Sequence, residues 1–286
     1  MQPIDPLPRE QYVDHVATAL AEDLGDRGDL TARYFLPAGV ARTARVVARE
    51  TGVVAGLAVA AEVCRQVDAG LVFAPLAGDG TAVAAGTVVA TLAGPVRSMV
   101  TAERTMLNYL QRLSGIASLS ALHVAACAGT KAVILDTRKT TPGWRVLEKY
   151  AVRCGGAQNH RMGLYDAAMV KDNHLACGLP VADMQSAIRQ LKEDHPGAWV
   201  EVEADTLGQV EKFLALAGVD RILLDNMPVA MLREAVAMVG GRVPLEASGG
   251  VTLASLPGIA ATGVDYISVG ALTHSARALD LALDFN

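Results

Sequence analysis

The pattern of hydrophobic and polar positions divides the chain into two parts, with a change near residue 130. In the first part, Val13, Val16, Leu20 and Leu24 lie on one face of a predicted helix that Gly25 ends. The pattern next predicts a turn at 28–31, strands at 43–50 and 52–56, a helix at 57–67, short strands within 70–92, and helices at about 98–113 and 119–128. This mixture indicates an α+β domain, which we expect to cover residues 1–115.

From residue 132 onward, strands alternate with helices, which is the pattern of a parallel sheet or barrel. Strand signals end near Asp136, Lys171, Glu201, Asp225, Ser248 and Gly270, and helices are predicted at 181–191, 207–216 and 229–239. Six strands are fewer than the eight of a complete barrel. We therefore expect an α/β fold in which an incomplete, open β/α barrel over residues 116–275 is preceded by the α+β domain. An irregular seventh strand is expected near 154–158, and the tail at about 276–286 is expected to pack on the first domain.

One segment of the chain differs from the rest in its charge. The 286-residue chain is acidic, with 25 Lys and Arg against 30 Asp and Glu, yet residues 136–174 are strongly basic. Arg138 and Lys139 follow one strand signal and Lys171 follows another, so these cations are expected at one edge of the sheet. For any single residue, a solvated surface charge is the better interpretation. Arginine and lysine together at strand ends nevertheless predict a ligand with several anionic groups.

Composition disfavours several other classes of protein. Aromatic residues are only 4% of the chain and do not alternate with a basic stripe, so we expect no nucleic-acid partner. No apolar run is long enough to span a bilayer, and the first residues lack the layout of a signal peptide, so we expect a cytoplasmic protein without a membrane partner. Cys64, Cys127, Cys154 and Cys177 are widely separated, which predicts reduced thiols rather than a disulfide framework or a zinc site.

Acidic and glycine-rich segments occur at the later strand signals. Glu201 and Glu203 alternate onto one face of their strand, and Asp225 ends the next strand. These carboxylates suit a cation, sugar hydroxyls or a developing positive charge, and magnesium brought in with a substrate phosphate is the expected metal. Ser248-Gly249-Gly250 and Gly270-Ala271 predict a phosphate site, because glycine lets backbone amides approach a phosphate closely. The combination suits a phosphorylated sugar and a small polyanionic acid.

Ordered motifs along nearly the whole chain resemble those of the quinolinate phosphoribosyltransferase family. They are Glu22-Asp23-Leu24-Gly25, Gly28-Asp29-Leu30-Thr31, Glu103-Arg104-Thr105, Leu113-Ser114-Gly115-Ile116-Ala117, Asp136-Thr137-Arg138-Lys139-Thr140, Asn159-His160-Arg161, Lys171-Asp172-Asn173-His174, Leu224-Asp225-Asn226, Ser248-Gly249-Gly250 and Val269-Gly270-Ala271-Leu272-Thr273. The resemblance implies that quinolinate and 5-phosphoribosyl 1-diphosphate react with Mg²⁺ as cofactor, in NAD biosynthesis. Nicotinate mononucleotide, carbon dioxide and diphosphate would be the products. A related molybdenum-linked group lacks the Lys-Asp-Asn-His motif.

The resemblance also implies roles for individual residues. Quinolinate would contact Thr137, Arg138, Lys139, His160, Arg161 and Lys171, together with Arg104 donated by the partner subunit of a homodimer or a higher oligomer. The phosphoribosyl diphosphate would contact Glu201, Asp225, Ser248, Gly249, Gly250, Val269, Gly270 and Ala271. The expected catalytic residues are Lys139, Lys171, Glu201 and Asp225. Glu201 and Asp225 are also the expected metal ligands, mainly through substrate and water.

Two departures from the family and two rival functions stay open at this point. Trp144 stands where a leucine is commoner, and Gly155-Gly156-Ala157 replaces three glycines, both beside the site. A lysine aldolase would use Lys139 or Lys171 to form a Schiff base, but such a lysine is normally desolvated or beside one other cation rather than among several arginines. A non-catalytic carboxylate sensor would leave the acidic residues unexplained.

Overall fold

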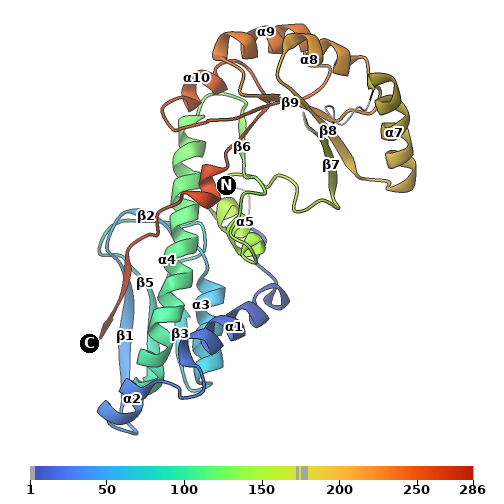
Figure 1. The fold of residues 1–286 in the computed structure, drawn as a ribbon. Helices are drawn as coiled ribbons and strands as arrows, with labels where there is room; N and C mark the ends of the chain where they lie inside the picture. Colours follow the sequence, from blue (N-terminus) through green and yellow to red (C-terminus); the bar gives the residue numbers. More distant parts are fainter. Residues whose placement is uncertain (1–3, 172–173, 175–179, 286) are drawn as a thin grey trace. The chain divides into compact units, whose positions relative to one another are not determined.

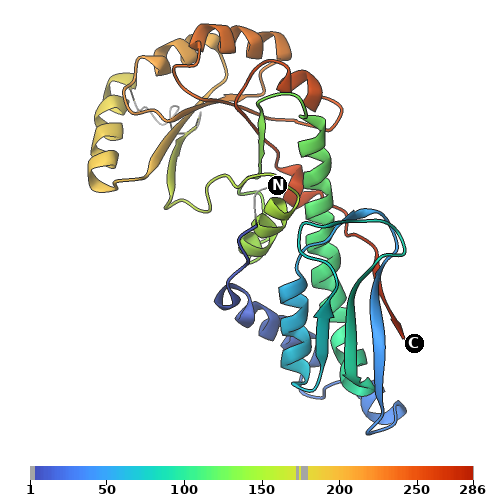
Figure 2. The ribbon, with the colours of Figure 1, turned by 180° about the vertical axis from the view of Figure 1, so that it is seen from behind.

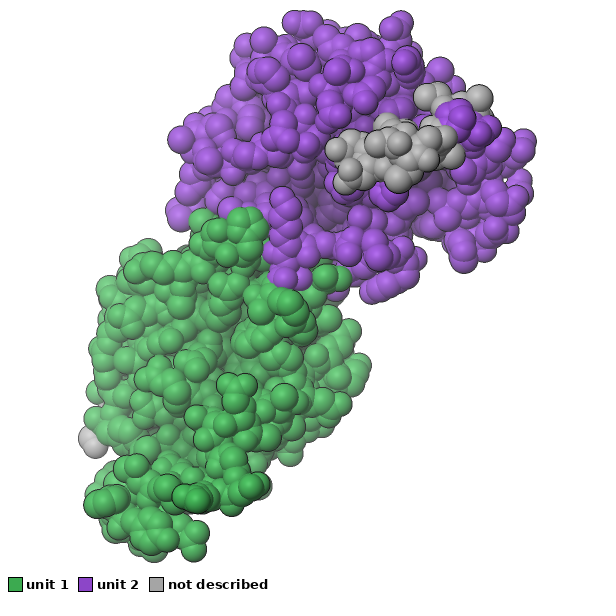
Figure 3. Space-filling view, in the orientation of Figure 1, with its two compact units in different colours: residues 1–121, 141–156, 272–286 green, residues 122–140, 157–271 purple. Residues whose placement is uncertain are grey.

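The computed structural model describes residues 4–171, 174 and 180–285, and the chain divides into two compact units (Figure 3). Unit 1 consists of Met1–Ala121, Thr141–Gly156 and Leu272–Asn286, and unit 2 of Leu122–Thr140 and Ala157–Ala271. This division differs from the expected boundaries of 1–115 and 116–275, because a segment from the middle of the chain belongs to unit 1. Asp172 and Asn173 of the Lys-Asp-Asn-His motif, and also Cys177, lie outside the described residues.

Unit 1 is built on a four-stranded antiparallel sheet with the strand order β12-β1-β5-β3 (Figures 1 and 2). The strands are β1 (Ala41–Ala48), β3 (Val72–Pro75), β5 (Val88–Pro95) and β12 (Leu281–Phe285), so the end of the chain completes this sheet. In β1, Ala44 and Val46 are buried while Thr43 and Arg45 are exposed, so one face of the sheet carries the core. A separate pair joins β2 (Gly52–Val53) to β4 (Ala82–Val83).

Helices of unit 1 pack beside this sheet, and they are η1 (Arg9–Gln11), α1 (Val13–Leu24), α2 (Leu30–Phe35) and α3 (Leu57–Val67). Of these, α1 and α3 lie where the sequence predicts helices. The sequence analysis predicts neither η1 nor α2, and α2 begins inside the predicted turn at 28–31. Its first turn is capped by Asp29, whose carboxylate accepts a hydrogen bond of 2.8 Å from the backbone N–H of Ala32.

A single helix, α4 (Val96–Ala126), replaces the two helices expected at about 98–113 and 119–128. The expected break at 114–118 is absent, because the buried stripe of Met99, Met106 and Leu110 continues through Leu113 and Ile116. Gly115 has a packing role instead. A Cβ atom at this position would come within 2.0 Å of the carbonyl oxygen of Arg277, so only glycine lets the C-terminal segment lie directly against the helix.

The segment Thr141–Gly156 belongs to unit 1 and contains α5 (Arg145–Cys154), a helix that the sequence analysis does not predict. Contacts of this segment attach it to the rest of unit 1. Glu148 is fully buried and forms an ion pair of 2.7 Å with Arg112 of α4. The hydroxyl of Tyr150 donates a hydrogen bond of 2.6 Å to Asp79. Gly155 then lies so close to α4 that a Cβ atom would be 2.3 Å from the carbonyl oxygen of Ala117. These contacts divide the basic window of the sequence between the two units.

Unit 2 is an open parallel sheet of six strands in the order β6-β11-β10-β9-β8-β7, with helices α7, α8 and α9 on its outer side in Figure 1. The strands are β6 (Val133–Leu135), β7 (Ala167–Val170), β8 (Trp199–Ala204), β9 (Arg221–Asp225), β10 (Leu245–Ser248) and β11 (Tyr266–Ser268). The helices are α7 (Val181–Asp194), α8 (Leu207–Leu214), α9 (Val229–Val239) and α10 (Leu256–Ala260), with α11 (Ala271–His274) at the boundary between the units. This confirms the predicted α/β class and the incomplete barrel.

The expected seventh strand near 154–158 is reduced to one bridge. Gln158 pairs with Leu135 at the edge strand β6, and its N–H donates a hydrogen bond of 2.9 Å to the carbonyl of Ile134. The residues before it, 154–156, end α5 and turn through Gly156 instead of extending. In the described part of the chain, no helix combines the length and the hydrophobicity that crossing a membrane requires. Cys64, Cys127 and Cys154 are free and buried, as predicted for reduced thiols.

Candidate active site

A cavity of about 680 Å³ lies at the carboxyl ends of the unit 2 strands. It gathers ten residues that the sequence analysis assigned to the site: Thr137, Arg138, Lys139, His160, Arg161, Lys171, Asp225, Ser248, Gly249 and Gly250. Six further residues complete its wall: Met169, Glu203, Leu223, Asn226, Glu246 and Ser268. Because parallel strands bring their carboxyl ends to one edge of a sheet, residues far apart in the sequence meet here.

The basic side of the cavity has the side chains to bind an anionic ligand. Arg161 is held by hydrogen bonds from its guanidinium to the carbonyl of Ala167 (3.1 Å) and to the Met169 sulfur (3.6 Å). Burial, and then the nearby charge of Arg138, lower the pKa of Arg161. The Nε of Arg138 is itself buried with no hydrogen-bond partner among the described residues. Two cations that repel each other and a buried unused donor together favour a bound carboxylate or phosphate.

The acidic side is formed by Glu203 rather than by Glu201. Both side chains lie on the same face of β8, as predicted, but the strand continues to Ala204. Glu201 is therefore in the middle of the strand and fully buried, while Glu203, nearer the carboxyl end, lines the cavity and forms an ion pair with Lys171. Glu201 is absent from the cavity wall in the described structure. The sequence analysis named Glu203 but did not assign it to the site, because alternation alone does not give the depth of a residue in the sheet.

The carboxylates of Glu203 and Asp225 fit a magnesium ion. Asp225 ends β9, and burial, followed by the charge of Glu203, raises the pKa of its carboxyl group. A bound cation would reduce the repulsion between these two partly buried carboxylates. Mg²⁺ prefers oxygen ligands of this kind. The amide of Asn226 donates a hydrogen bond of 2.7 Å to Asp225 and holds its orientation. The sequence analysis named Glu201 and Asp225 as the metal ligands, and magnesium binding at those two residues stays a prediction.

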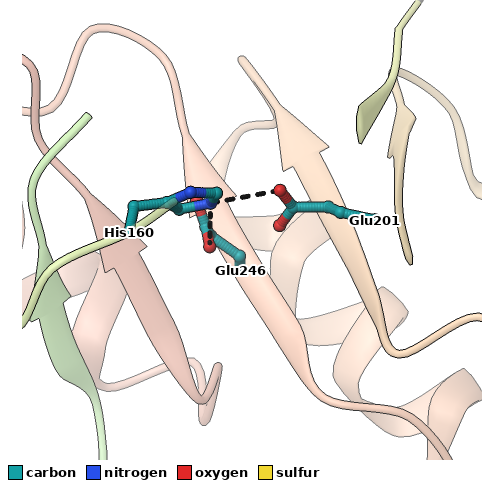
Figure 4. Close-up of side chains that lie close together, drawn as sticks. All are labelled: His160, Glu201 and Glu246. Carbon is teal, nitrogen blue, oxygen red and sulfur yellow. Dashed lines mark ion pairs between the residues drawn. The ribbon is translucent and has the colours of Figure 1, made fainter. Parts of the chain in front are cut away.

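At the cavity wall, His160 contacts two buried carboxylates (Figure 4). Its Nε2 is 3.1 Å from an oxygen of Glu201 and 3.4 Å from an oxygen of Glu246. Burial opposes the charge on the imidazole, but the contacts and charges of the two glutamates raise the pKa of His160 to about 9. The backbone of His160 is fixed by Asp136, whose carboxylate accepts hydrogen bonds from the His160 N–H (2.9 Å) and the Asn159 amide (2.6 Å). The two glutamates therefore favour the charged form of the histidine, whereas the Arg161 N–H, which donates a hydrogen bond of 2.7 Å to Nδ1, favours the neutral form.

The same three side chains lie within 4.8 Å of one another, which is close enough to hold a metal ion. Arg221, however, already contacts this cluster, with its Nη1 at 2.5 Å from an oxygen of Glu246. Burial raises the pKa of Glu201, whereas the contacts and charges of His160 and Arg221 outweigh burial and lower the pKa of Glu246. The cluster therefore fits an internal ion network, and the oxygen ligands of Glu203 and Asp225 suit a hard cation better.

The glycine-rich loop after β10 has a conformation that requires glycine. Gly249 and Gly250 have φ values of +96° and +58°, and a Cβ atom on Gly249 would come within 2.2 Å of the Asn226 side-chain oxygen. Asn226, itself at φ 52°, donates its backbone N–H to the carbonyl of Ser248 at 2.9 Å. These contacts join the ends of β9 and β10 and expose a loop that lines the cavity.

Three residues that follow β11 are predicted to contact a phosphate, but none of them lines the cavity in the described structure. Val269 is buried, and its N–H donates a hydrogen bond of 2.9 Å to the carbonyl of Leu135, so this amide is used within the sheet. Gly270 and Ala271 are not on the cavity wall in the described structure, whereas Ser268, at the end of β11, is. Contacts of Gly270 and Ala271 with a phosphate stay a prediction.

Arg104 belongs to unit 1 and is exposed on α4. It lines a second cavity, of about 420 Å³, whose other walls include Glu22, Asp23 and Trp144. Trp144, which departs from the commoner leucine, stacks on Tyr109 with 5.1 Å between the ring centres and an interplanar angle of 24°. Trp144 therefore takes part in the aromatic packing of unit 1.

Comparisons with known proteins identify the family of the chain. The family model described as "Quinolinate phosphoribosyl transferase, N-terminal domain" matches residues 29–114, and the corresponding C-terminal domain matches residues 116–284. The chain is 45% identical to a Mycobacterium leprae nicotinate-nucleotide pyrophosphorylase [carboxylating], over 95% of this chain and 96% of that protein. It is 42% identical to quinolinate phosphoribosyltransferase [decarboxylating] 1b of Nicotiana tabacum, over 94% of this chain and 80% of that protein.

A solved structure gives the same result. The nicotinate-nucleotide pyrophosphorylase of Francisella tularensis superimposes with a TM-score of 0.91 at 38% sequence identity, over 100% of both chains. The order of elements, the cavity at the strand ends and both domain matches lead to one conclusion: this chain belongs to the quinolinate phosphoribosyltransferase family.

Proposed function

We propose that the protein transfers the phosphoribosyl group of 5-phosphoribosyl 1-diphosphate to quinolinate with loss of carbon dioxide, which yields nicotinate mononucleotide and diphosphate for NAD biosynthesis. One observation carries the proposal most directly. A single cavity places Arg138 and Arg161 together with the carboxylates of Glu203 and Asp225 and the Gly249-Gly250 loop. Such a cavity has cations for a dicarboxylic acid, carboxylates for a metal-bound diphosphate, and backbone amides for a phosphate.

The basic residues would hold quinolinate by its two carboxylates. Arg138 has a buried, unused Nε, and Arg161 is fixed by its contacts with Ala167 and Met169. Each charge-assisted hydrogen bond to a bound carboxylate contributes roughly 1.5–3 kcal/mol. Held in this way, the ring nitrogen stays near the sugar carbon that it attacks, which lowers the entropic part of the barrier.

The acidic side would hold the sugar and the magnesium ion. Mg²⁺, bound through Glu203, Asp225 and substrate oxygens, would neutralise the departing diphosphate. As the bond between the anomeric carbon and diphosphate breaks, its electron pair leaves with the diphosphate, and the two carboxylates stabilise the positive charge on the ribose. Lys139 and Lys171 supply further positive charge to the diphosphate oxygens. Glu201, buried beneath, acts through His160 rather than on the sugar itself.

The second step is the loss of carbon dioxide. Once the ring nitrogen has bonded to the anomeric carbon, the ring is a pyridinium that accepts electrons. The bond from the ring to the adjacent carboxylate then breaks, its electron pair stays on the ring carbon, and a proton from solvent replaces carbon dioxide. The charged His160 and the arginines beside the cavity keep the remaining carboxylate in place.

Release of labelled carbon dioxide from quinolinate carrying the label in its 2-carboxylate tests this function. Release should require both 5-phosphoribosyl 1-diphosphate and Mg²⁺. Nicotinic acid should react poorly, because it lacks the 2-carboxylate that the arginines hold. Equal turnover of the two acids would show that the basic pocket does not select a dicarboxylate, and trapping of a carbonyl substrate by borohydride would support a lysine aldolase instead.

We also propose that the active enzyme is a homodimer in which Arg104 enters the cavity of the partner subunit. The described wall of the large cavity comes from unit 2, while Arg104 is an exposed cation of unit 1. The buried stripe of α4, including Met106 and Leu110, directs Arg104 away from its own core. A two-fold interface would create two equivalent shared sites.

Mixing of inactive variants tests the shared site. After subunit exchange, equal amounts of Arg104→Ala and Lys171→Ala protein should recover about a quarter of the wild-type activity, because half of the dimers are mixed and each has one intact site. Arg138→Ala mixed with Lys171→Ala is the matched control and should stay inactive, because both residues line the cavity of one chain. If exchange is verified by mass and neither mixture regains activity, Arg104 does not act across an interface.

A further inference from the structure

The interior of unit 2 contains a column of charged and aromatic side chains that begins at the amino ends of the strands. Arg221, Trp199 and Tyr266 are each the first residue of their strands, β9, β8 and β11. Glu201 and Glu246 lie further along the strands, and the register places Glu201 beside Arg221 and Glu246 beside Tyr266. His160 follows at the cavity wall. Interiors of such barrels are normally filled by branched apolar residues, so this column requires an explanation.

Arg221 is held between two aromatic rings. Its guanidinium carbon is 3.9 Å from the centre of the Tyr266 ring and 4.9 Å from that of Trp199. Only 15% of its side chain is exposed. A guanidinium on the face of an aromatic ring is stabilised by the ring's quadrupole, and the contact is stronger where water is excluded. The two rings therefore fix the position of the guanidinium.

The fixed guanidinium reaches the carboxylates that hold His160. Its Nη1 lies 2.5 Å from Oε2 of Glu246, and its Nε lies 4.0 Å from Oε1 of Glu201. The same Oε2 of Glu246 is 3.4 Å from Nε2 of His160 (Figure 4). One carboxylate oxygen thus links Arg221 to His160.

Both glutamates are fully buried, so their charges require partners. Without Arg221, two carboxylates would share the single cation of His160. The repulsion between them would turn Glu246 away or neutralise it, and the Nε2 of His160 would lose its contact with Glu246. Arg221 is not part of the cavity wall in the described structure, so its effect on a ligand passes through Glu246 and His160.

We propose that Arg221 is a positioning residue that, through Glu246, fixes the orientation of His160 and thereby determines how tightly the cavity holds the carboxylates of quinolinate. The inference rests on the proposed function. It assigns a role in substrate binding to a residue at the amino end of its strand. The active site lies at the carboxyl ends, and residues at the amino ends of barrel strands normally contribute only to stability.

Steady-state kinetics of Arg221→Gln test the role. The KM for quinolinate should rise about tenfold, the loss expected when one contact of a charged group is disturbed indirectly. The KM for 5-phosphoribosyl 1-diphosphate should stay near the wild-type value, because that substrate meets other side chains. Arg233→Gln, which alters an exposed arginine of the same unit, is the matched control and should leave both constants unchanged.

Two further variants separate positioning from folding. Arg221→Lys keeps the charge but not the planar contact with the rings, so its KM for quinolinate should fall between those of the wild type and Arg221→Gln. Arg221→Gln combined with Glu246→Gln removes the buried unpaired charge, so its effect should be smaller than the product of the two single effects. Should Arg221→Gln not fold, the Lys variant and Glu246→Gln still test the split between the two KM values.

Equal changes in both KM values, or a lower unfolding temperature with an unchanged KM for quinolinate, would show that Arg221 only stabilises the sheet. The kinetics of the wild type separate this result from a failure of the proposed function. If the wild-type protein releases no carbon dioxide from quinolinate, the proposed function is wrong, and that outcome appears before any variant is compared.

Discussion

The pH dependence of stability should report the buried charge on His160. The contacts of Glu201 and Glu246 outweigh burial and raise the pKa of this histidine from an ordinary 6.5 to about 9. The folded state therefore holds the proton more tightly than the unfolded state does. This contribution to stability is fully present below pH 6.5 and is lost as the pH rises through 9.

The difference between the two pKa values corresponds to about 3 kcal/mol at pH 6, and linkage predicts that most of this stabilisation is lost by about pH 9. The side chain of His160 is only 4% exposed, so solvent screening reduces this value little. Urea unfolding followed by circular dichroism between pH 6 and pH 9.5 measures the effect. His160→Gln is the comparison, because every other titratable group is the same in both proteins.

The free energy of unfolding of the wild type should fall relative to that of His160→Gln by about 3 kcal/mol over this range. Nuclear magnetic resonance of the imidazole gives the pKa directly. A constant difference between the two proteins, together with a measured pKa for His160 near 6.5, would refute the argument that the buried glutamates hold an imidazolium.

Three further predictions concern other parts of the molecule. Arg161→Ala should weaken quinolinate binding by roughly 1.5–3 kcal/mol while the unfolding temperature changes little, and a variant that unfolds instead would mark Arg161 as structural. Gly115→Ala should destabilise unit 1 by about 3 kcal/mol, because the new Cβ atom meets the Arg277 carbonyl at 2.0 Å. Calorimetric unfolding measures this cost, and an unchanged unfolding temperature would mean that the C-terminal segment moves freely. Glu203→Gln should raise the magnesium concentration needed for half-maximal activity several-fold, and an unaltered magnesium requirement would remove Glu203 from the metal site.

Local pattern was sufficient for much of the fold. The helix at 57–67 and the helix at 229–239 follow from their apolar faces, and the six parallel strands follow from alternating strand and helix signals, because these patterns depend on neighbours within one element. Ten of the residues assigned to the site line one cavity, because strand ends are visible in the sequence and parallel strands bring those ends together.

Contacts between distant segments decided the rest. Whether Glu201 or Glu203 reaches the cavity depends on where β8 ends in the sheet, and alternation alone gives both the same face. Gly115 lies within α4, and its lack of a side chain is needed only because the backbone of Arg277, far along the chain, packs against the helix at that point. Arg221 is an unremarkable first residue of a strand until tertiary structure places it between Trp199 and Tyr266 and beside a buried carboxylate. Local periodicity therefore determined the helices and strands and the polar residues at their ends. Packing between distant segments decided how deeply each side chain is buried, which residues it contacts and which charged groups lie together.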